Sequence, residues 1–249
     1  MSGHSKWSTI KRKKGALDAK RSKIFSKISK EITVAATLGG PDVESNPRLR
    51  MAVQNAKGQN MSKDVIERAI NKADKDLSKF EELTFEGYGP EGIAIFVECL
   101  TDNNNRTVGS VRSIFAKHGG HLATSGSVSF LFDRKGVFVV PDDGNVDTES
   151  LELQMIEAGA ESLEKDESVY IITSAFEDFG NVSKKLEETA IEAESQKLER
   201  IPTTTTTLDV GQGKKVIQLV EHLEEDDDVQ QVYHNLEMTP ELEQALNED

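Results

Sequence analysis

The chain has very few of the residues on which disulfide, metal-cluster and membrane proteins depend. Of its 249 residues one is a cysteine, Cys99, and only 6% are aromatic, with a single tryptophan. One cysteine excludes an intramolecular disulfide framework and any zinc or iron–sulfur site that needs several thiolates. Cys99 lies in the apolar run 93–100, a position typical of a small buried hydrophobe. A single, buried cysteine fits a reducing compartment. No segment approaches the roughly 18 apolar residues of a transmembrane helix, so we expect a protein that does not cross a membrane.

The N-terminal segment also lacks the apolar stretch of a secretory signal peptide. It is basic, contains serine and is nearly free of acidic residues, as a mitochondrial transit peptide is. Its first 17 residues, however, contain almost no apolar side chains besides Trp7, Ile10 and Leu17, too few for the apolar face of such a presequence. We therefore expect this segment to belong to the mature protein.

Charge is divided unevenly along the chain. Residues 1–80 contain 18 Lys and Arg against 8 Asp and Glu, a net charge of +10. Because the whole chain has a formal net charge of −14, residues 81–249 carry −24. Such an asymmetry indicates that one part of the protein binds nucleic acid, whereas phosphate would repel the acidic remainder. Within the first 30 residues the only acid is Asp18, and the basic residues are Lys6, Lys11, Arg12, Lys13, Lys14, Lys20, Arg21, Lys23, Lys27 and Lys30.

Three helices are predicted in the basic N-terminal region. Residues 1–15 have no apolar periodicity and are expected to be a mobile arm. A helix over 17–38 would carry its apolar residues on one stripe and four lysines on the opposite side. Helices over 47–57 and 63–76 each follow a capping residue. We interpret residues 1–76 as a basic helical domain that binds nucleic acid.

Strands and helices alternate in the rest of the chain. Residues 77–92 end in three glycines and a proline and are expected to be a turn-rich linker. The threonine run 203–207 favours an extended chain because its residues are β-branched. Strands are expected at 93–100, 127–132, 136–140, 168–173, 198–208 and 229–236, with a weaker one at 161–164, and helices at 106–118, 147–158, 177–194 and 213–223.

This order predicts an α+β multidomain protein in which two ferredoxin-like domains of βαββαβ connectivity follow the helical domain. Residues 93–132 together with 201–238 would form one, and residues 133–200 would form the other, inserted into the first. Two consecutive α+β domains are the plainer alternative, which the element order does not exclude. Residues 239–249 are expected to be an acidic tail, and the acidic run 224–228 a solvated helix end.

The basic arm and the lysine face of the first helix are the main candidate contact surface. Lysine and arginine bind phosphate without regard to sequence. Trp7 could stack on an unpaired base or instead pin the arm to its own domain. Arg48, Arg50 and Lys57 would extend this basic surface.

A polar segment at 102–107, DNNNRT, is a second candidate. Asparagines before a helix commonly cap it, and this is the simpler interpretation. The alternative is a contact loop of Asn103, Asn105, Arg106 and Thr107, which would bind an anion at the helix N-terminus.

Catalytic and metal-binding patterns are weak in this sequence. His118 and His121 flank two glycines and could meet a metal as a pair, but no third ligand of suitable spacing is near. The acidic run 224–228 lacks the spacing of a calcium loop, and no nucleophile–base signature is present. We expect a protein that is not an enzyme and needs no cofactor.

Several short motifs resemble those of the YebC family, the bacterial group that includes the mitochondrial translational activator of cytochrome c oxidase subunit I. They are GHSKW at 3–7, Arg21, Lys23 and Phe25, AA at 35–36, GG at 39–40, NPRLR at 46–50, AK at 56–57, NM at 60–61, EGYGP at 86–90, LTDN at 100–103, NRT at 105–107 and GSV at 126–128. Glu91 and the residues HLA at 121–123 depart from the usual family pattern.

The resemblance implies a cytoplasmic, non-enzymatic factor with a helical domain and two α+β domains. Bacterial members are described as DNA-binding transcriptional regulators, whereas others resemble translation factors that act on the ribosome, including at proline-rich stalls. DNA and ribosomal RNA are thus both expected partners, and no membrane or obligatory small molecule is. A module whose basic head binds an acidic protein is a further alternative. The predicted nucleic-acid contacts are His4, Ser5, Lys6, Trp7, Lys11, Arg12, Lys13, Lys14, Lys20, Arg21, Lys23, Lys27, Lys30, Arg48, Arg50 and Lys57, with His4, Lys6 and Trp7 carried by the resemblance.

Overall fold

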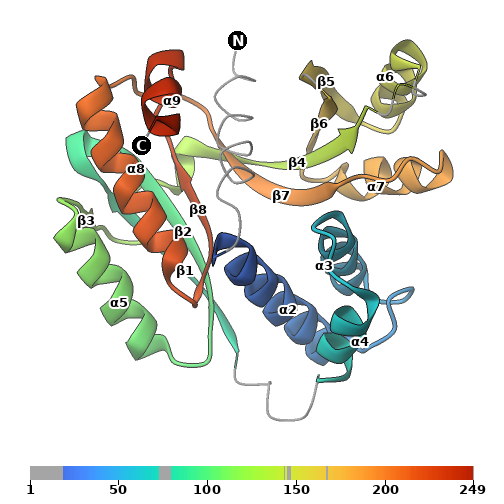
Figure 1. The fold of residues 1–249 in the computed structure, drawn as a ribbon, viewed down its shortest axis with the longest axis horizontal. Helices are drawn as coiled ribbons and strands as arrows, with labels where there is room; N and C mark the ends of the chain where they lie inside the picture. Colours follow the sequence, from blue (N-terminus) through green and yellow to red (C-terminus); the bar gives the residue numbers. More distant parts are fainter. Residues whose placement is uncertain (1–18, 73–79, 143, 145–146, 167, 249) are drawn as a thin grey trace. The chain divides into compact units, whose positions relative to one another are not determined.

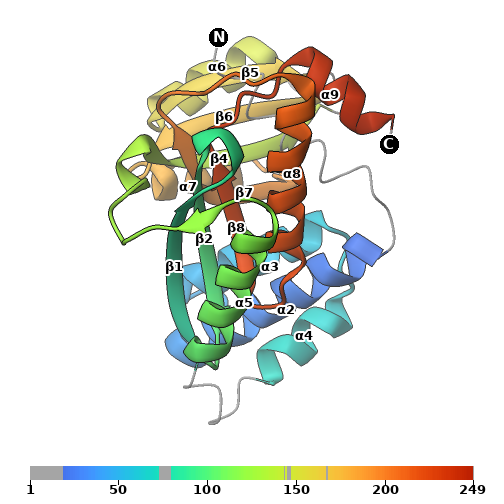
Figure 2. The same ribbon diagram turned by 90° about the vertical axis from the view of Figure 1, so that its left-hand side faces the viewer.

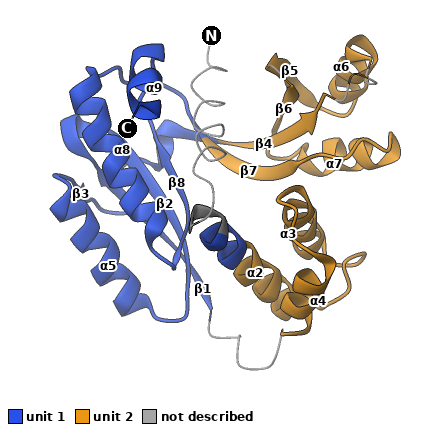
Figure 3. Ribbon diagram, viewed as in Figure 1, with its two compact units in different colours: residues 1–27, 79–133, 201–249 blue, residues 28–78, 134–200 orange. Residues whose placement is uncertain are grey.

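A computed structural model describes the chain except for residues 1–18, 73–79, 143, 145–146, 167 and 249. The described residues form eight α-helices and two four-stranded sheets (Figure 1), which confirms the predicted α+β class. They divide into two compact units (Figure 3): unit 1 contains Met1–Lys27, Lys79–Asp133 and Ile201–Asp249, and unit 2 contains Ile28–Ser78 and Arg134–Arg200.

None of the helices in the described ranges combines the length and apolarity needed to cross a bilayer. Residues 1–15, for which the sequence predicts a mobile arm, lie outside the described residues.

The three predicted N-terminal helices are α2 (Ala19–Gly39), α3 (Pro47–Gly58) and α4 (Lys63–Asn71). Of the predicted apolar stripe of α2, Ile32, Ala35 and Ala36 are buried, whereas Ile24, Phe25 and Ile28 are half-buried. Asn46 fixes the connection between α2 and α3, because its Oδ1 accepts a hydrogen bond from the Leu49 N–H (3.1 Å) and its Nδ2 donates to the Ala35 carbonyl (2.8 Å). The predicted N-cap is therefore confirmed, and it also ties the end of one helix to the start of the next.

The sheet of unit 1 has the strand order β3-β1-β2-β8. Its strands are β1 (Glu81–Tyr88), β2 (Ala94–Thr101), β3 (His121–Leu122) and β8 (Val229–His234), and its helices are α5 (Asn104–Lys117), α8 (Val210–Glu225) and α9 (Pro240–Asn247). Both α5 and α8 cover one face of the sheet (Figure 2), where Phe115 and Leu219 join Ile95 in the core. A smaller cluster around Phe96 and Phe132 covers the opposite side.

The sheet of unit 2 has the strand order β5-β6-β4-β7. In chain order its elements are β4 (Phe132–Pro141), α6 (Thr148–Glu157), β5 (Ala160–Asp166), β6 (Val169–Ala175), α7 (Phe179–Glu188) and β7 (Ser195–Pro202). This βαββαβ order, with the first and third strands at the centre, is the connectivity of a ferredoxin-like fold. The core contains Phe138, Met155, Tyr170 and Leu186. The boundaries proposed for the domains themselves stay a prediction.

Within unit 2 the helix α3 lies against the edge strand β7. The Asn55 amide pairs with the backbone of Gln196, accepting from its N–H (2.9 Å) and donating to its carbonyl (2.9 Å). Gly58 comes so close to the backbone of Glu194 that an added Cβ would lie 1.7 Å from the carbonyl oxygen. Edge strands leave backbone groups unpaired, and Asn55 satisfies two of them.

Two predictions around the first sheet are wrong. Residues 77–92 were expected to be a linker, but they contain β1, which pairs antiparallel with β2 from Glu81 to Tyr88. Residues 127–132 were expected to be a strand, but Ser129–Leu131 form a short 3-10 helix. The backbone N–H groups of Val128 and Ser129 donate to the Glu86 carboxylate, so they are not available to a strand ladder. The first sheet is therefore not built with the predicted βαββαβ order.

Three further boundaries differ from the sequence prediction. The threonine run 203–207 is exposed. It is held by a bridge between Thr206 and Leu236 and by hydrogen bonds such as that from the Thr203 N–H to the Leu131 carbonyl (2.9 Å), and it does not continue β7. The helix expected over 177–194 ends at Glu188, because Ala190 turns the chain with a positive φ of 54°. Residues 239–249 are not simply a tail, since they contain the helix α9, whose Leu242 is buried in the core of unit 1.

Candidate nucleic-acid interface

Much of the predicted contact surface lies outside the part of the chain that the structure describes. This applies to the arm residues His4, Ser5, Lys6, Trp7, Lys11, Arg12, Lys13 and Lys14. Lys20 and Arg21 belong to the first turns of α2, where the backbone but not the side chains is described. The described candidates on this helix are therefore Lys23, Lys27 and Lys30.

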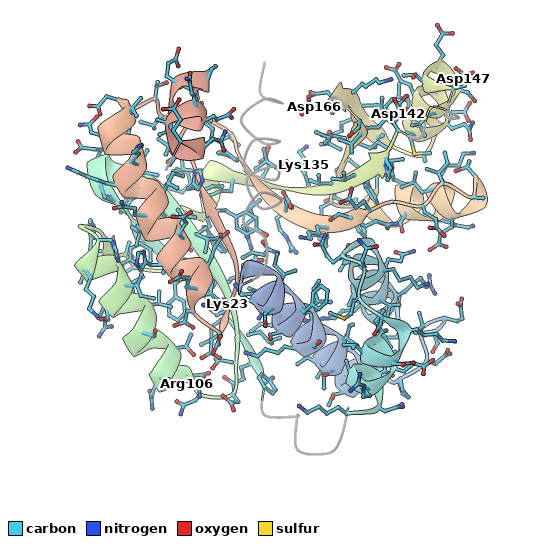
Figure 4. All side chains as sticks on the ribbon, in the orientation of Figure 1. Lys23, Arg106, Lys135, Asp142, Asp147 and Asp166 are labelled. Atoms are coloured by element: carbon cyan, nitrogen blue, oxygen red, sulfur yellow. The ribbon has the colours of Figure 1, made fainter. Side chains whose placement is uncertain are left out.

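Two of these lysines contact the last turn of α8. The Lys23 Nζ donates to the Glu225 carbonyl (2.7 Å), and the Lys27 Nζ donates to the Glu224 carbonyl (2.8 Å). Lys23 is exposed and Lys27 is half-buried, and Figure 4 labels Lys23 near the start of α2. The two residues are four positions apart and so share one helix face. Lys23 and Lys27, two members of the predicted lysine face, thus hold the end of another helix in this structure.

Arg48 and Arg50 each bind acceptors in the helical region of unit 2. The Arg48 Nε forms an ion pair with the Glu31 carboxylate at 2.8 Å, which joins α3 to α2. Arg50 donates to the carbonyls of Val43 and Glu44 in the loop between these helices. Lys57 is exposed in the last turn of α3. Both arginines thus have structural partners within the helical region.

The predicted contact loop is part of an ionic cluster in unit 1. Asn103 caps α5, since its Oδ1 accepts from the Arg106 N–H at 3.1 Å, which confirms the capping interpretation. The Arg106 guanidinium binds both oxygens of the buried Asp228 (2.8 and 3.0 Å) and the Asp102 carboxylate (2.8 Å). These partners raise the pKa of Arg106, the hydrogen bonds from Asp228 contributing most. Figure 4 labels Arg106 on α5.

The other members of that loop differ in environment. Thr107 is buried, and its hydroxyl oxygen lies within hydrogen-bond distance of the Asp228 carboxylate (2.9 Å), to which it can donate, and of the Thr101 hydroxyl (2.8 Å). Asn105 is exposed at the first turn of α5. Asp228 therefore lies between a guanidinium and a hydroxyl group, and the carboxylate holds the start of α5 against the end of α8.

Sequence reasoning did not identify Glu86 as an important residue. Its buried carboxylate accepts three backbone N–H groups, from Gly126 (2.7 Å), Val128 (2.6 Å) and Ser129 (2.8 Å). Burial alone would raise the pKa of Glu86, but these donors together lower it below the ordinary value. The signal lay in the EGYGP and GSV motifs, which the structure brings together, although nothing in their spacing predicts that contact.

The histidines do not form the pair that the sequence suggested. The His118 ring lies 4.1 Å from the ring of His222, and the His121 ring lies 5.7 Å from that of Tyr88. Burial lowers the pKa of His118, with His222 and Lys117 adding to the effect. In the described ranges no three His, Cys, Asp or Glu side chains are grouped as metal ligands.

The fold and the basic N-terminal region define a class of α+β proteins with a cationic helical segment ahead of two sheet-containing regions. The chain belongs to the TACO1/YebC family. Residues 5–76 match the family's model for the TACO1/YebC protein N-terminal domain, and residues 80–236 match the model for the TACO1/YebC second and third domain.

Relatives and a solved structure cover almost the whole chain. A probable transcriptional regulatory protein of Hathewaya histolytica is 49% identical over 239 residues, 95% of this chain and 97% of the relative. Another, from Persephonella marina, is 50% identical over 251 residues, 99% of this chain and all of the relative. The crystal structure of a conserved hypothetical protein of Aquifex aeolicus has a TM-score of 0.78 and 46% identity, and the match covers 89% of this chain and 92% of that one. The Hathewaya and Persephonella relatives are named as probable transcriptional regulatory proteins, which agrees with a regulatory role at the level of the family.

Proposed function

We propose that the protein is a nucleic-acid-binding regulator of gene expression that acts in the cytoplasm through its basic N-terminal domain. The observation that carries the proposal is the charge division, +10 in residues 1–80 against −24 in the rest of the chain. A cationic region of this kind binds the phosphate backbone and releases counterions. The names of the relatives, probable transcriptional regulatory proteins, support DNA as the first candidate partner.

The lysines of α2 and the arm residues are the proposed phosphate contacts. Lysine ammonium groups bind phosphate as point charges and need no fixed geometry. Lys23 and Lys27 donate to backbone carbonyls, whereas Arg48 pairs with a carboxylate. We therefore assign the stronger contribution to phosphate binding to Lys23, Lys27 and the arm, and a structural role to Arg48 and Arg50.

A ribosome-associated translation factor that contacts ribosomal RNA, including at proline-rich stalls, is the second candidate function. One observation favours it. In a helix that reads a DNA groove, side chains near the helix start contact base edges, and carboxylates there would be repelled by phosphate. The exposed face of α4 carries Asp64 and Glu67, and Lys63 lies 3.6 Å from the Glu67 carboxylate. A flexible cationic surface suits folded RNA, which proteins recognise largely by shape and backbone.

Co-sedimentation with ribosomes, compared with binding to promoter DNA at the same salt concentration, separates the two functions. Specific retention on promoter DNA with none on ribosomes supports transcriptional regulation. Binding to ribosomes without preference for any promoter supports the translation factor and removes the DNA proposal. Binding to neither contradicts the proposed function as a whole.

A further inference from the structure

The contact between α2 and the end of α8 joins two oppositely charged segments of unit 1. Lys23 and Lys27 belong to the Met1–Lys27 part of this unit, and Glu224 and Glu225 belong to the Ile201–Asp249 part. Each ammonium group donates to one backbone carbonyl, at 2.7 Å and 2.8 Å. About two hundred residues of chain separate the donors from their acceptors, so this is a tertiary contact and not a local turn.

The end of α8 is well suited to bind cations. The final carbonyls of a helix have no partner inside the helix, and the helix dipole gives this end a partial negative charge. The helix stops at Glu225, and Asp226 is already extended, with φ −68° and ψ 133°. The acidic run 224–228, which begins in the last turn of α8, places five carboxylates at this end.

The acidic residues in this run have different neighbours. Asp226 bonds to the Ser110 hydroxyl, and Asp228 bonds to Arg106 and Thr107, so both face α5. The backbone of Glu224 and Glu225 instead meets the lysines of α2. The run therefore has side chains that hold α5 and backbone carbonyls that accept hydrogen bonds from the lysines of α2.

We propose that the C-terminal end of α8 is an internal competitor for the nucleic-acid site. It occupies the ammonium groups of Lys23 and Lys27 in the free protein, and phosphates displace it when nucleic acid binds. The inference rests on the proposed function, since it requires that these lysines contact phosphate. A carbonyl oxygen and a phosphate oxygen are alternative acceptors for the same N–H donors, and a bound phosphate adds a full negative charge.

Such competition lowers the apparent affinity of the protein for nucleic acid. When only a fraction of molecules has the site open, the apparent dissociation constant rises by the inverse of that fraction. A regulator that must discriminate between weak and strong nucleic-acid sites gains from this competition. An isolated phosphate does not displace the end of α8 from the lysines, whereas a nucleic-acid surface that also binds the arm does.

The test uses the full chain with Glu224→Gln and Glu225→Gln together, which weakens the negative end of α8 without removing a proposed phosphate contact. A matched control, Glu241→Gln with Glu248→Gln, makes the same change in net charge on exposed residues of the α9 segment. Affinity is measured for a duplex DNA of mixed sequence and for folded ribosomal RNA. At physiological salt, charges beyond about 8 Å are largely screened, so the control should change affinity little.

We expect the α8 variant to bind about fivefold more tightly or better, the lower end of typical coupling between sites. Hydrogen exchange of the wild type gives a second readout. The amides of residues 226–229 should exchange faster in the nucleic-acid complex than in the free protein, which is the reverse of ordinary protection by a ligand.

The inference is overturned if the control variant gains as much affinity as the α8 variant. It is also overturned if the amides of residues 226–229 exchange in the nucleic-acid complex at the same rate as in the free protein, or more slowly. Either result leaves the proposed function intact, because binding itself has then been observed. If neither the wild type nor the variants bind either nucleic acid, the proposed function fails and this inference fails with it.

Discussion

At the scale of single residues, buried polar groups with several partners hold the loops of this protein. Glu86 binds three backbone N–H groups of the segment that follows β3, and Asp228 binds the side chains that begin α5. A carboxylate in such a position is stabilised only while its donors remain in place, because an unpaired buried charge is costly. Each therefore fixes a backbone conformation that local propensity leaves open.

Replacing Glu86 with glutamine should destabilise the protein by about 2 kcal/mol. A glutamine can accept through one oxygen, but its amide group then faces a backbone N–H and leaves that donor unsatisfied. Urea unfolding at neutral pH measures the loss. Glu82→Gln, an exposed change on the same strand, is the control and should stay close to the wild type; an equal loss in both variants would contradict the role of Glu86.

The difference between wild type and Glu86→Gln should depend on pH. Because the pKa of Glu86 is lowered in the folded protein, its contribution is present above the ordinary glutamate pKa of about 4.3 and is lost as the pH falls through the lower folded value. Unfolding free energies of both proteins, measured from neutral to acidic pH, should therefore converge at the acidic end. A gap that stays constant across this range would show that charge is not the cause.

Gly58 is required by the close approach of α3 to β7. Gly58→Ala should destabilise by about 1–3 kcal/mol, the usual result of forcing extra volume into a filled site, because the new Cβ would overlap the Glu194 carbonyl. Gly109→Ala in α5 is the matched control, since its Cβ would have no heavy atom within 4 Å. There the better helix propensity of alanine should stabilise by about 0.5–1 kcal/mol. Thermal unfolding of the two variants should thus shift in opposite directions, and a stabilised Gly58→Ala protein would refute the contact.

At the scale of elements, the sequence predicts what local signals specify and misses what distant partners specify. The starts of α3 and α5 follow from Asn46 and Asn103, whose side chains cap the first turn. The strand β2 follows from an apolar run that is buried on both faces. The strand β1 has no such run, because it carries three glutamates and its order depends on pairing with β2.

The basic candidate site was predictable only in part for the same reason. Its charge and its helical face can be read from the sequence, since both are local properties. The positions of its partners cannot, because Lys23 and Lys27 meet residues about two hundred positions away, and Arg106 meets Asp228 at a separation of 122. Tertiary contacts of this kind leave no periodic trace in the sequence.

The helix α9 should contribute to the stability of unit 1, which a disordered tail would not. Leu242→Ala should cost about 2–5 kcal/mol, because Leu242 is buried and lies beside Gly213 of α8. Leu153→Ala on α6 is the control, since Leu153 is 61% exposed. If neither variant changes the free energy of unfolding in urea, residues 239–249 do not pack on the core of unit 1.

At the scale of the whole molecule, the protein combines a cationic head, residues 1–80, with an acidic remainder, residues 81–249. Its net charge of −14 opposes approach to nucleic acid, so contact should be confined to the head, where the local charge is positive. The acidic remainder would also limit nonspecific binding along bulk nucleic acid.

Deleting residues 1–15 should weaken binding to nucleic acid while the fold stays intact. The deletion removes Lys6, Lys11, Arg12, Lys13, Lys14 and Trp7, and each lost phosphate contact also makes the salt dependence less steep. Circular dichroism and thermal unfolding check the fold, and binding to duplex DNA and ribosomal RNA checks the function. An unchanged affinity would exclude the arm from the contact surface.

The most direct test of the central claim is a salt titration of binding by the full chain. If the basic N-terminal domain neutralises about six phosphates of duplex DNA, the logarithm of the association constant should fall with the logarithm of salt concentration at a slope near −5. Folded ribosomal RNA should give a steep negative slope as well. An affinity that stays flat as salt rises would contradict the claim that phosphate contacts from this domain carry the function.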